Sequence, residues 1–93
     1  MNTATSRRTL TIALLGEILE TDPATLRPGD RLRDDLGLDS LQSLELLSRL
    51  AEELRIDLPM EEALELRTVD DACRFVETAW RAQSGAREEP LRG

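Results

Sequence analysis

Apolar residues recur along most of this chain at the three- and four-residue spacing of α-helices. Three long segments follow that spacing, at residues 6–20, 40–54 and 69–82. A shorter apolar segment, at residues 60–66, follows Pro59 and has room for only one or two turns. The pattern predicts an all-α fold, a four-helix bundle whose third helix is short.

Capping signals precede two of the predicted helices. Asp39 is followed three positions later by Gln42, and Thr68 is followed in the same way by Asp71. Both pairs fit the capping box, in which a side chain at each of the two positions accepts a backbone N–H of the other. We therefore expect a helix to begin directly after Asp39, which places Ser40 in its first turn.

Residues 23–39 show neither helical nor strand spacing. This segment contains two prolines, two glycines and single leucines at positions 26, 32, 36 and 38. A long connection in a small domain is uncommon and usually serves function. The sequence predicts a long first loop that its leucines hold against the core.

Helical geometry divides residues 40–54 between two faces. Leu46, Leu47, Leu50 and Leu54 share one arc with Ser43 and form the predicted buried stripe. The opposite face carries leucines among acidic and polar residues, namely Leu41, Leu44, Glu45, Ser48 and Glu52. Such a face is typical either of a solvated helix surface or of a docking patch, where charge steers a partner and leucine supplies contact area.

Composition limits the classes of function. The 93 residues suit a single domain, and a net charge of −7 disfavours nucleic acid and anionic membrane surfaces as partners. The chain has no His and one Cys, so neither a disulfide nor a metal site is expected. No apolar run has transmembrane length and no secretory signal is evident, which favours a cytoplasmic protein.

Ser40 lacks the surroundings of a catalytic serine. A serine hydroxyl becomes a nucleophile when a base, usually His and sometimes Lys, takes its proton, and this chain contains neither. The residues alone leave two interpretations: a plain serine in a first helical turn, or an accessible serine that another enzyme modifies. In either case we expect the protein not to be an enzyme.

The run Asp35-Leu36-Gly37-Leu38-Asp39-Ser40-Leu41 closely resembles the D-L-G-x-D-S-L signature of acyl carrier proteins. The resemblance extends from Leu32 to Val76. It implies an acyl-carrier-like four-helix bundle in which Ser40 receives 4′-phosphopantetheine from coenzyme A. The thiol of that arm would hold acyl groups as thioesters, and Asp39 would help to position the Mg²⁺ of the transferase.

The resemblance also implies partners. A phosphopantetheinyl transferase would attach the arm, and ketosynthase, acyltransferase or acyl-activating enzymes would process the acyl group. Leu41, Glu45 and Glu52 match family positions that meet such enzymes, and Leu44 and Ser48 lie beside them. We expect a monomer.

Departures from the family pattern favour one branch of it. Gln42 stands where many fatty-acid carriers have an acid, and Arg49 and Ala51 interrupt the usual acidic ridge. Leu38 and Asp39 replace the second glycine and the His that are frequent in peptidyl carriers. These differences favour a discrete carrier of polyketide or hybrid natural-product biosynthesis. The alternatives are a fatty-acid carrier, a peptidyl or aminoacyl carrier, and a helical adaptor with unmodified Ser40.

The sequence predicts three parts: a flexible N-terminus at residues 1–5, the carrier domain at 6–82, and a disordered tail at 83–93. Ser6 is a candidate N-cap of the first helix. Cys73 lies on one helical stripe with valines, which predicts a buried thiol. We expect Phe75 in the core, and Trp80 either in the core or along a channel for the acyl chain.

Overall fold

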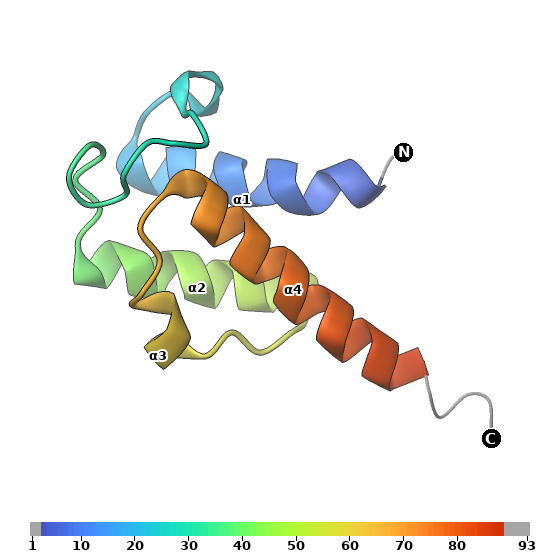
Figure 1. Ribbon diagram of the computed structural model, residues 1–93. Helices are drawn as coiled ribbons and strands as arrows, with labels where there is room; N and C mark the ends of the chain where they lie inside the picture. The colour runs from blue at the N-terminus through green and yellow to red at the C-terminus, as the bar shows by residue number, and fades with distance from the viewer. Residues whose placement is uncertain (1–2, 89–93) are drawn as a thin grey trace.

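A computed structural model describes the backbone of residues 3–88 and the side chains of residues 7–84. In that part of the chain four α-helices and a short 3-10 helix form (Figure 1), with no strand beyond an isolated bridge between Arg31 and Thr68. The elements are α1 Thr3–Leu19, η1 Pro23–Thr25, α2 Ser40–Leu54, α3 Met60–Ala63 and α4 Val69–Glu88. The predicted all-α architecture, with its long first loop and short third helix, is confirmed.

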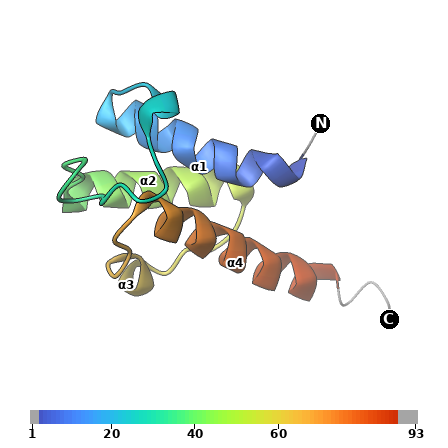
Figure 2. The same cartoon turned by 45° about the horizontal axis from the view of Figure 1, so that its top comes forward.

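Helix α1 packs against both α2 and α4, and α4 crosses the other two obliquely (Figures 1 and 2). The short α3 lies outside this trio, beside α2. Buried aliphatic residues from the three long helices and the first loop form one core: Leu14, Leu15, Leu32, Leu38, Leu46, Leu50, Val69, Ala72, Cys73 and Val76. Burial of this apolar surface is the main stabilising contribution to the bundle.

The first loop is anchored to the rest of the molecule by buried leucines and by backbone hydrogen bonds. Leu32 and Leu38 belong to the core. The Leu32 N–H donates to the Arg67 carbonyl at 2.8 Å, and the Leu38 N–H donates to the Leu32 carbonyl at 2.8 Å. The prediction of a loop held by its leucines is confirmed, and the loop is fixed where it leads into α2.

Both predicted capping boxes form. Asp39 caps α2, with its Oδ1 accepting the Gln42 N–H at 2.8 Å, while Gln42 Oε1 accepts the Asp39 N–H at 3.0 Å. Thr68 Oγ1 accepts the Asp71 N–H at 3.1 Å, and Asp71 Oδ2 accepts the Thr68 N–H at 3.2 Å. Each cap satisfies backbone groups that a helix start leaves unpaired, and is worth about 1 kcal/mol.

Helix α1 begins earlier than the sequence pattern indicated. It starts at Thr3, so residues 3–5 are helical and Ser6 lies within the first turns instead of at the N-cap. Two arginines hold this end of α1 against α4. Arg7 makes a bidentate pair with Glu77 and stacks over the Trp80 ring at 3.7 Å, and Arg8 contacts Asp70 at 3.0 Å. These contacts fix the first turns of α1 against α4.

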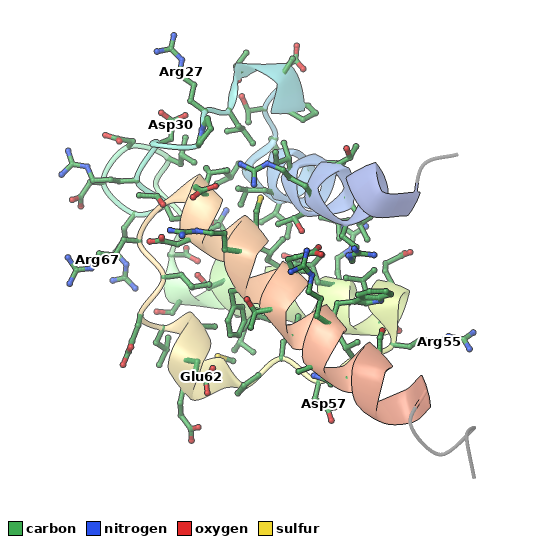
Figure 3. All side chains as sticks on the ribbon, turned by 45° about the vertical axis from the view of Figure 1, so that its right-hand side comes forward. Arg27, Asp30, Arg55, Asp57, Glu62 and Arg67 are labelled. Atoms are coloured by element: carbon green, nitrogen blue, oxygen red, sulfur yellow. The ribbon has the colours of Figure 1, made fainter. Side chains whose placement is uncertain are left out.

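Helix α4 also continues beyond the predicted boundary at Ala82, through Glu88. Gln83, which the sequence assigned to a tail, binds the backbone of the α2–α3 connection. Its Oε1 accepts the Asp57 N–H at 2.8 Å, and its Nε2 donates to the Asp57 carbonyl at 2.8 Å. Figure 3 places Asp57 beside the later turns of α4. The rest of the predicted tail, residues 89–93, lies outside the described residues.

The expectation for Phe75 is wrong, whereas that for Cys73 is confirmed. The α4 residues in the core are Val69, Ala72, Cys73 and Val76, which follow the three- and four-residue spacing of one stripe. Phe75 lies about 100° from Val76 around the helix and is only half-buried. The aliphatic stripe therefore faces the core, and the single phenylalanine lies at its edge.

Candidate functional site

Ser40 is the first residue of α2, and its side chain is exposed. The polar groups around it are already satisfied by its neighbours, because Asp39 and Gln42 cap the helix and Ser43 Oγ donates to the Asp39 carbonyl at 3.0 Å. Among the described residues, none forms a hydrogen bond with the Ser40 hydroxyl. The hydroxyl is therefore accessible and uncommitted.

The chain turns sharply just before Ser40. Gly37 adopts a φ of 71°, a left-handed conformation that favours glycine, although a Cβ there would meet no other atom. Leu38 then enters the core with 4% of its surface exposed. On the other side of the turn, Asp35 accepts the Arg31 N–H at 2.8 Å, and this hydrogen bond holds the pKa of the Asp35 carboxyl below its ordinary value. The turn is fixed at both sides and presents Ser40 outward.

Ser40 has no histidine or lysine beside it that could act as a general base. The sequence contains no His or Lys, and the Asp39 carboxylate is engaged in the helix cap. The start of α2 also carries the positive end of a helix dipole, which stabilises a negatively charged group attached there. These features suit a serine that accepts a phosphate ester from another enzyme.

The outer face of α2 is exposed as the helical geometry predicts. Leu41 exposes 74% of its surface and Leu44 exposes 44%. Glu45, Ser48 and Glu52 are also exposed, whereas Leu46, Leu47 and Leu50 are buried on the other side. The structure therefore brings all five predicted face residues to one surface, which we call the α2 outer face.

Two residues that depart from the family pattern have structural partners. The Gln42 side chain is part of the helix cap, in which its Oε1 accepts the Asp39 N–H, a role that a carboxylate could also fill. In addition, Gln42 Nε2 reaches the Ile18 carbonyl at 3.5 Å. Arg49 pairs with Glu17 of α1 at 2.9 Å. The Arg49 charge is thus opposed by a carboxylate on the neighbouring helix.

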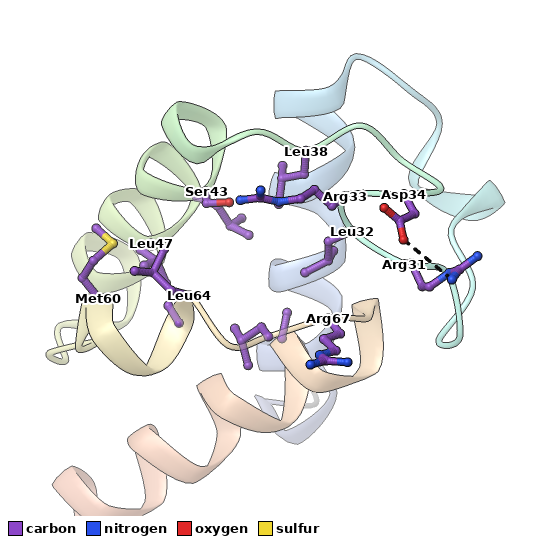
Figure 4. Close-up of a pocket in the computed structure, with 14 residues that line it drawn as sticks. Arg31, Leu32, Arg33, Asp34, Leu38, Ser43, Leu47, Met60, Leu64 and Arg67 are labelled. Atoms are coloured by element: carbon purple, nitrogen blue, oxygen red, sulfur yellow. Dashed lines mark ion pairs between the residues drawn. The ribbon is translucent and has the colours of Figure 1, made fainter.

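A cavity of about 350 Å³ opens between the first loop, α2, α3 and the start of α4 (Figure 4). Ser43 lines it, one helical turn after Ser40. Its apolar wall includes Leu46, Leu47, Met60 and Leu64, and three arginines lie on the side of the loops. Neither Phe75 nor Trp80 lines this cavity. The volume falls at the lower end of the range for small-molecule sites.

The cavity has no single sequence signal, because its wall comes from four separate segments. One signal was present in α3, where Met60 and Leu64 are four residues apart and share a helix face. Leu64 exposes 62% of its surface although it is a large apolar residue. An apolar pair in so short a helix indicates a surface that faces a cavity or a partner.

Other chemistry is absent from the described residues. Cys73 is buried, and burial raises the pKa of its thiol, so the thiolate is disfavoured. Within residues 3–88, no cluster of three metal-ligating side chains occurs. No helix in that range combines the length and apolar character needed to cross a membrane.

Comparisons with known proteins agree with this geometry. The family model for a phosphopantetheine attachment site matches residues 10–76. The chain is 41% identical over 66 residues to the acyl carrier protein of Treponema pallidum, which covers 71% of this chain and 85% of that protein. It is 39% identical over 64 residues to the acyl carrier protein of Thermosynechococcus vestitus, covering 69% and 79% of the two chains.

The fold comparison leads to the same class. A solved structure of an acyl carrier protein from Mycobacterium tuberculosis superposes with a TM-score of 0.71 at 30% sequence identity, covering 77% of this chain and 96% of that one. Fold and site together define a helical carrier that holds a covalent phosphopantetheine group and is not itself an enzyme. The chain belongs to the acyl carrier protein family.

Proposed function

We propose that this protein is an acyl carrier in polyketide or hybrid natural-product biosynthesis, and that Ser40 is the attachment point of its phosphopantetheine arm. The observation that carries the assignment of Ser40 is its exposed hydroxyl, which has no hydrogen-bond partner among the described residues, at the first position of α2. The helix dipole at that position stabilises the attached phosphate.

Attachment requires help from outside the chain. The Ser40 oxygen forms a bond to the phosphorus of the pantetheine phosphate, the diphosphate bond of coenzyme A breaks so that adenosine 3′,5′-bisphosphate leaves, and the serine proton passes to a base of the transferase. Asp39 lies next to Ser40, is exposed, and accepts the capping hydrogen bond through Oδ1, which leaves its other carboxylate oxygen outside the cap. That oxygen is available to a Mg²⁺ ion in the transferase complex. The arm supplies a thiol that holds acyl groups as thioesters.

The α2 outer face is the proposed docking surface for the transferase and for ketosynthase, acyltransferase or acyl-activating enzymes. Exposed leucines at 41 and 44 offer apolar contact, and Glu45 and Glu52 offer negative charge to basic partner surfaces. Ser48 lies between the two glutamates. The cavity beside Ser43 is the proposed site for the tail of the acyl group.

The assignment to polyketide or hybrid biosynthesis rests on Gln42 and Ala51, which remove acidic positions from the docking ridge. A fatty-acid carrier is the alternative, and it is compatible with relatives named simply as acyl carrier proteins. Mass spectrometry of the protein isolated from its native host distinguishes the two. Oxygenated or partly reduced acyl masses are expected, and a series of saturated acyl groups alone would contradict this assignment.

Intact mass tests the attachment site. We expect incubation with coenzyme A, Mg²⁺ and a broad-specificity phosphopantetheinyl transferase to add one arm to the wild-type protein and none to Ser40→Ala. Thr78→Ala is the matched control, because Thr78 is an exposed hydroxyl residue outside the α2 outer face, and this variant should gain the arm normally. A wild-type mass that does not change, or an arm that still appears on Ser40→Ala, sinks the assignment and favours an unmodified adaptor.

A further inference from the structure

Two arginines lie at the rim of the cavity that opens beside Ser43. Arg33 belongs to the first loop and Arg67 to the connection between α3 and α4. In the view of Figure 4, the Arg33 side chain extends toward Ser43, and Arg67 lies at another side of the opening. The opposite wall is formed by apolar side chains of α2 and α3. The cavity therefore has an apolar wall and a rim of arginines, and the carboxylate among its lining residues, Asp34, pairs with Arg31.

These two guanidinium groups have no carboxylate partner, in contrast to most arginines of the described chain. Arg31, which also lines the cavity, pairs with Asp34 at 3.7 Å and with Asp35 at 3.5 Å. Within the described residues, neither Arg33 nor Arg67 forms an ion pair or a side-chain hydrogen bond. An acidic protein of net charge −7 thus keeps two uncompensated cations at one apolar cavity.

The chemistry of this arrangement selects a ligand with two parts. Apolar walls accept methylene groups, whereas a guanidinium presents paired N–H donors that match the two oxygens of a carboxylate. A purely saturated acyl chain would leave both cations unused. On the basis of the proposed function, we infer that the cavity receives acyl groups whose far end bears a carboxylate, and that Arg33 and Arg67 bind that carboxylate.

A matched pair of loaded proteins tests this inference. Glutaryl and pentanoyl groups have the same number of carbon atoms and differ in the terminal carboxylate. Each is attached to Ser40 from its coenzyme A thioester, and the midpoint of thermal unfolding is measured at low ionic strength. We expect the glutaryl form to unfold about 2–5 °C above the pentanoyl form, because a ligand that binds only the folded state stabilises it.

The sign of this difference is informative. Without a cationic receptor, an added carboxylate on an acidic protein increases self-repulsion and lowers the midpoint or leaves it unchanged. We expect the glutaryl advantage to vanish in the double variant Arg33→Gln with Arg67→Gln. It should persist in Arg27→Gln, since Arg27 is an exposed loop arginine outside the cavity that points away from the helices (Figure 3).

Three outcomes overturn the inference. The first is equal midpoints for the two loaded wild-type proteins, and the second is a glutaryl advantage that survives in the double variant. The third is that the double variant lowers the unfolding midpoint as much in the protein that carries the arm without an acyl group as in the glutaryl form. That result would assign the arginines to the arm's phosphate. Failure of the proposed function is separately visible, because intact mass would then show no arm on Ser40.

Discussion

At the scale of single residues, Asp39 has two tasks under the proposed function. Its carboxylate caps α2 through the Gln42 N–H, and it is the acid next to the serine that receives the arm. The first task needs a hydrogen-bond acceptor of the right length, and the second needs a negative charge. An amide side chain keeps the acceptor and loses the charge, so substitution can separate the two tasks.

We predict that Asp39→Ala lowers the free energy of unfolding by about 1 kcal/mol, because the helix loses its cap. Asp39→Asn should stay within about 0.5 kcal/mol of the wild type while arm transfer slows in both variants. Urea unfolding measures the stabilities, and intact mass against time measures the transfer. Equal transfer rates in the wild type and Asp39→Asn would remove Asp39 from the proposed Mg²⁺ site.

At the scale of elements, the contacts of α4 explain how a short α3 is kept in place. The α2–α3 connection has no regular structure, and Gln83 binds both backbone groups of Asp57 within it. Arg7 and Glu77 join α1 to α4 on a different side. Two side chains of α4 outside its buried stripe, Glu77 and Gln83, thus hold α1 on one side and the α2–α3 connection on the other.

We predict that Gln83→Ala lowers the free energy of unfolding by about 1–2 kcal/mol, since the two hydrogen bonds contribute about 0.5–1.5 kcal/mol each. Thr78→Ala is the control, because Thr78 is an exposed residue of the same helix, and it should change stability by less than about 0.5 kcal/mol. Urea unfolding measures both. A Gln83→Ala variant as stable as the control would show that the Asp57 contact contributes nothing.

Local signals identify the starts of α2 and α4, because a capping box lies within four consecutive residues. The extension of α4 beyond Ala82 includes Gln83, whose partner Asp57 lies 26 positions away in the sequence, and no local pattern reveals such a contact. The positions of Ser40 and of the α2 outer face, like the helix starts, can be predicted from sequence because their residues lie within one helix. The cavity cannot, since it forms only when the loops and α3 assemble.

At the scale of the whole molecule, acidic residues outnumber basic ones by 19 to 12, and ion pairs hold some of those acids in place. The Arg7 hydrogen bonds hold the pKa of the Glu77 carboxyl below its ordinary value. Hydrogen bonds from the Arg67 and Thr68 backbone do the same for the pKa of Asp71. A lowered folded-state pKa means that the ionised form stabilises the fold.

The pH dependence of stability follows from these shifts. The contribution of Glu77 is fully present above its unfolded pKa of about 4.3 and is lost as pH falls through the lower folded value. We predict that wild-type stability declines below about pH 4.5 and that Glu77→Gln declines less steeply. Glu65→Gln, which changes an exposed acid, should keep the wild-type slope. Thermal unfolding from pH 7 to pH 3 tests this, and parallel curves for all three proteins would contradict it.

Charge also governs encounter with partners. We predict that Glu45→Arg slows arm transfer about tenfold at low ionic strength without changing helicity, because it reverses an exposed charge on the α2 outer face. The effect should shrink in high salt, as screening weakens steering. Glu62→Arg on α3 is the control of equal charge change. Equal transfer rates for the two variants would place the docking surface elsewhere.

Because Asp39, Gln42 and Ser43 complete the first turn of α2 without the Ser40 hydroxyl, an arm on Ser40, as proposed, breaks no hydrogen bond of the fold. Armed and unarmed proteins then share one backbone and one docking surface. An enzyme that must select between them has to recognise the pantetheine itself. Under the proposed function, the unarmed form therefore competes with the armed form for partners that dock on the α2 outer face.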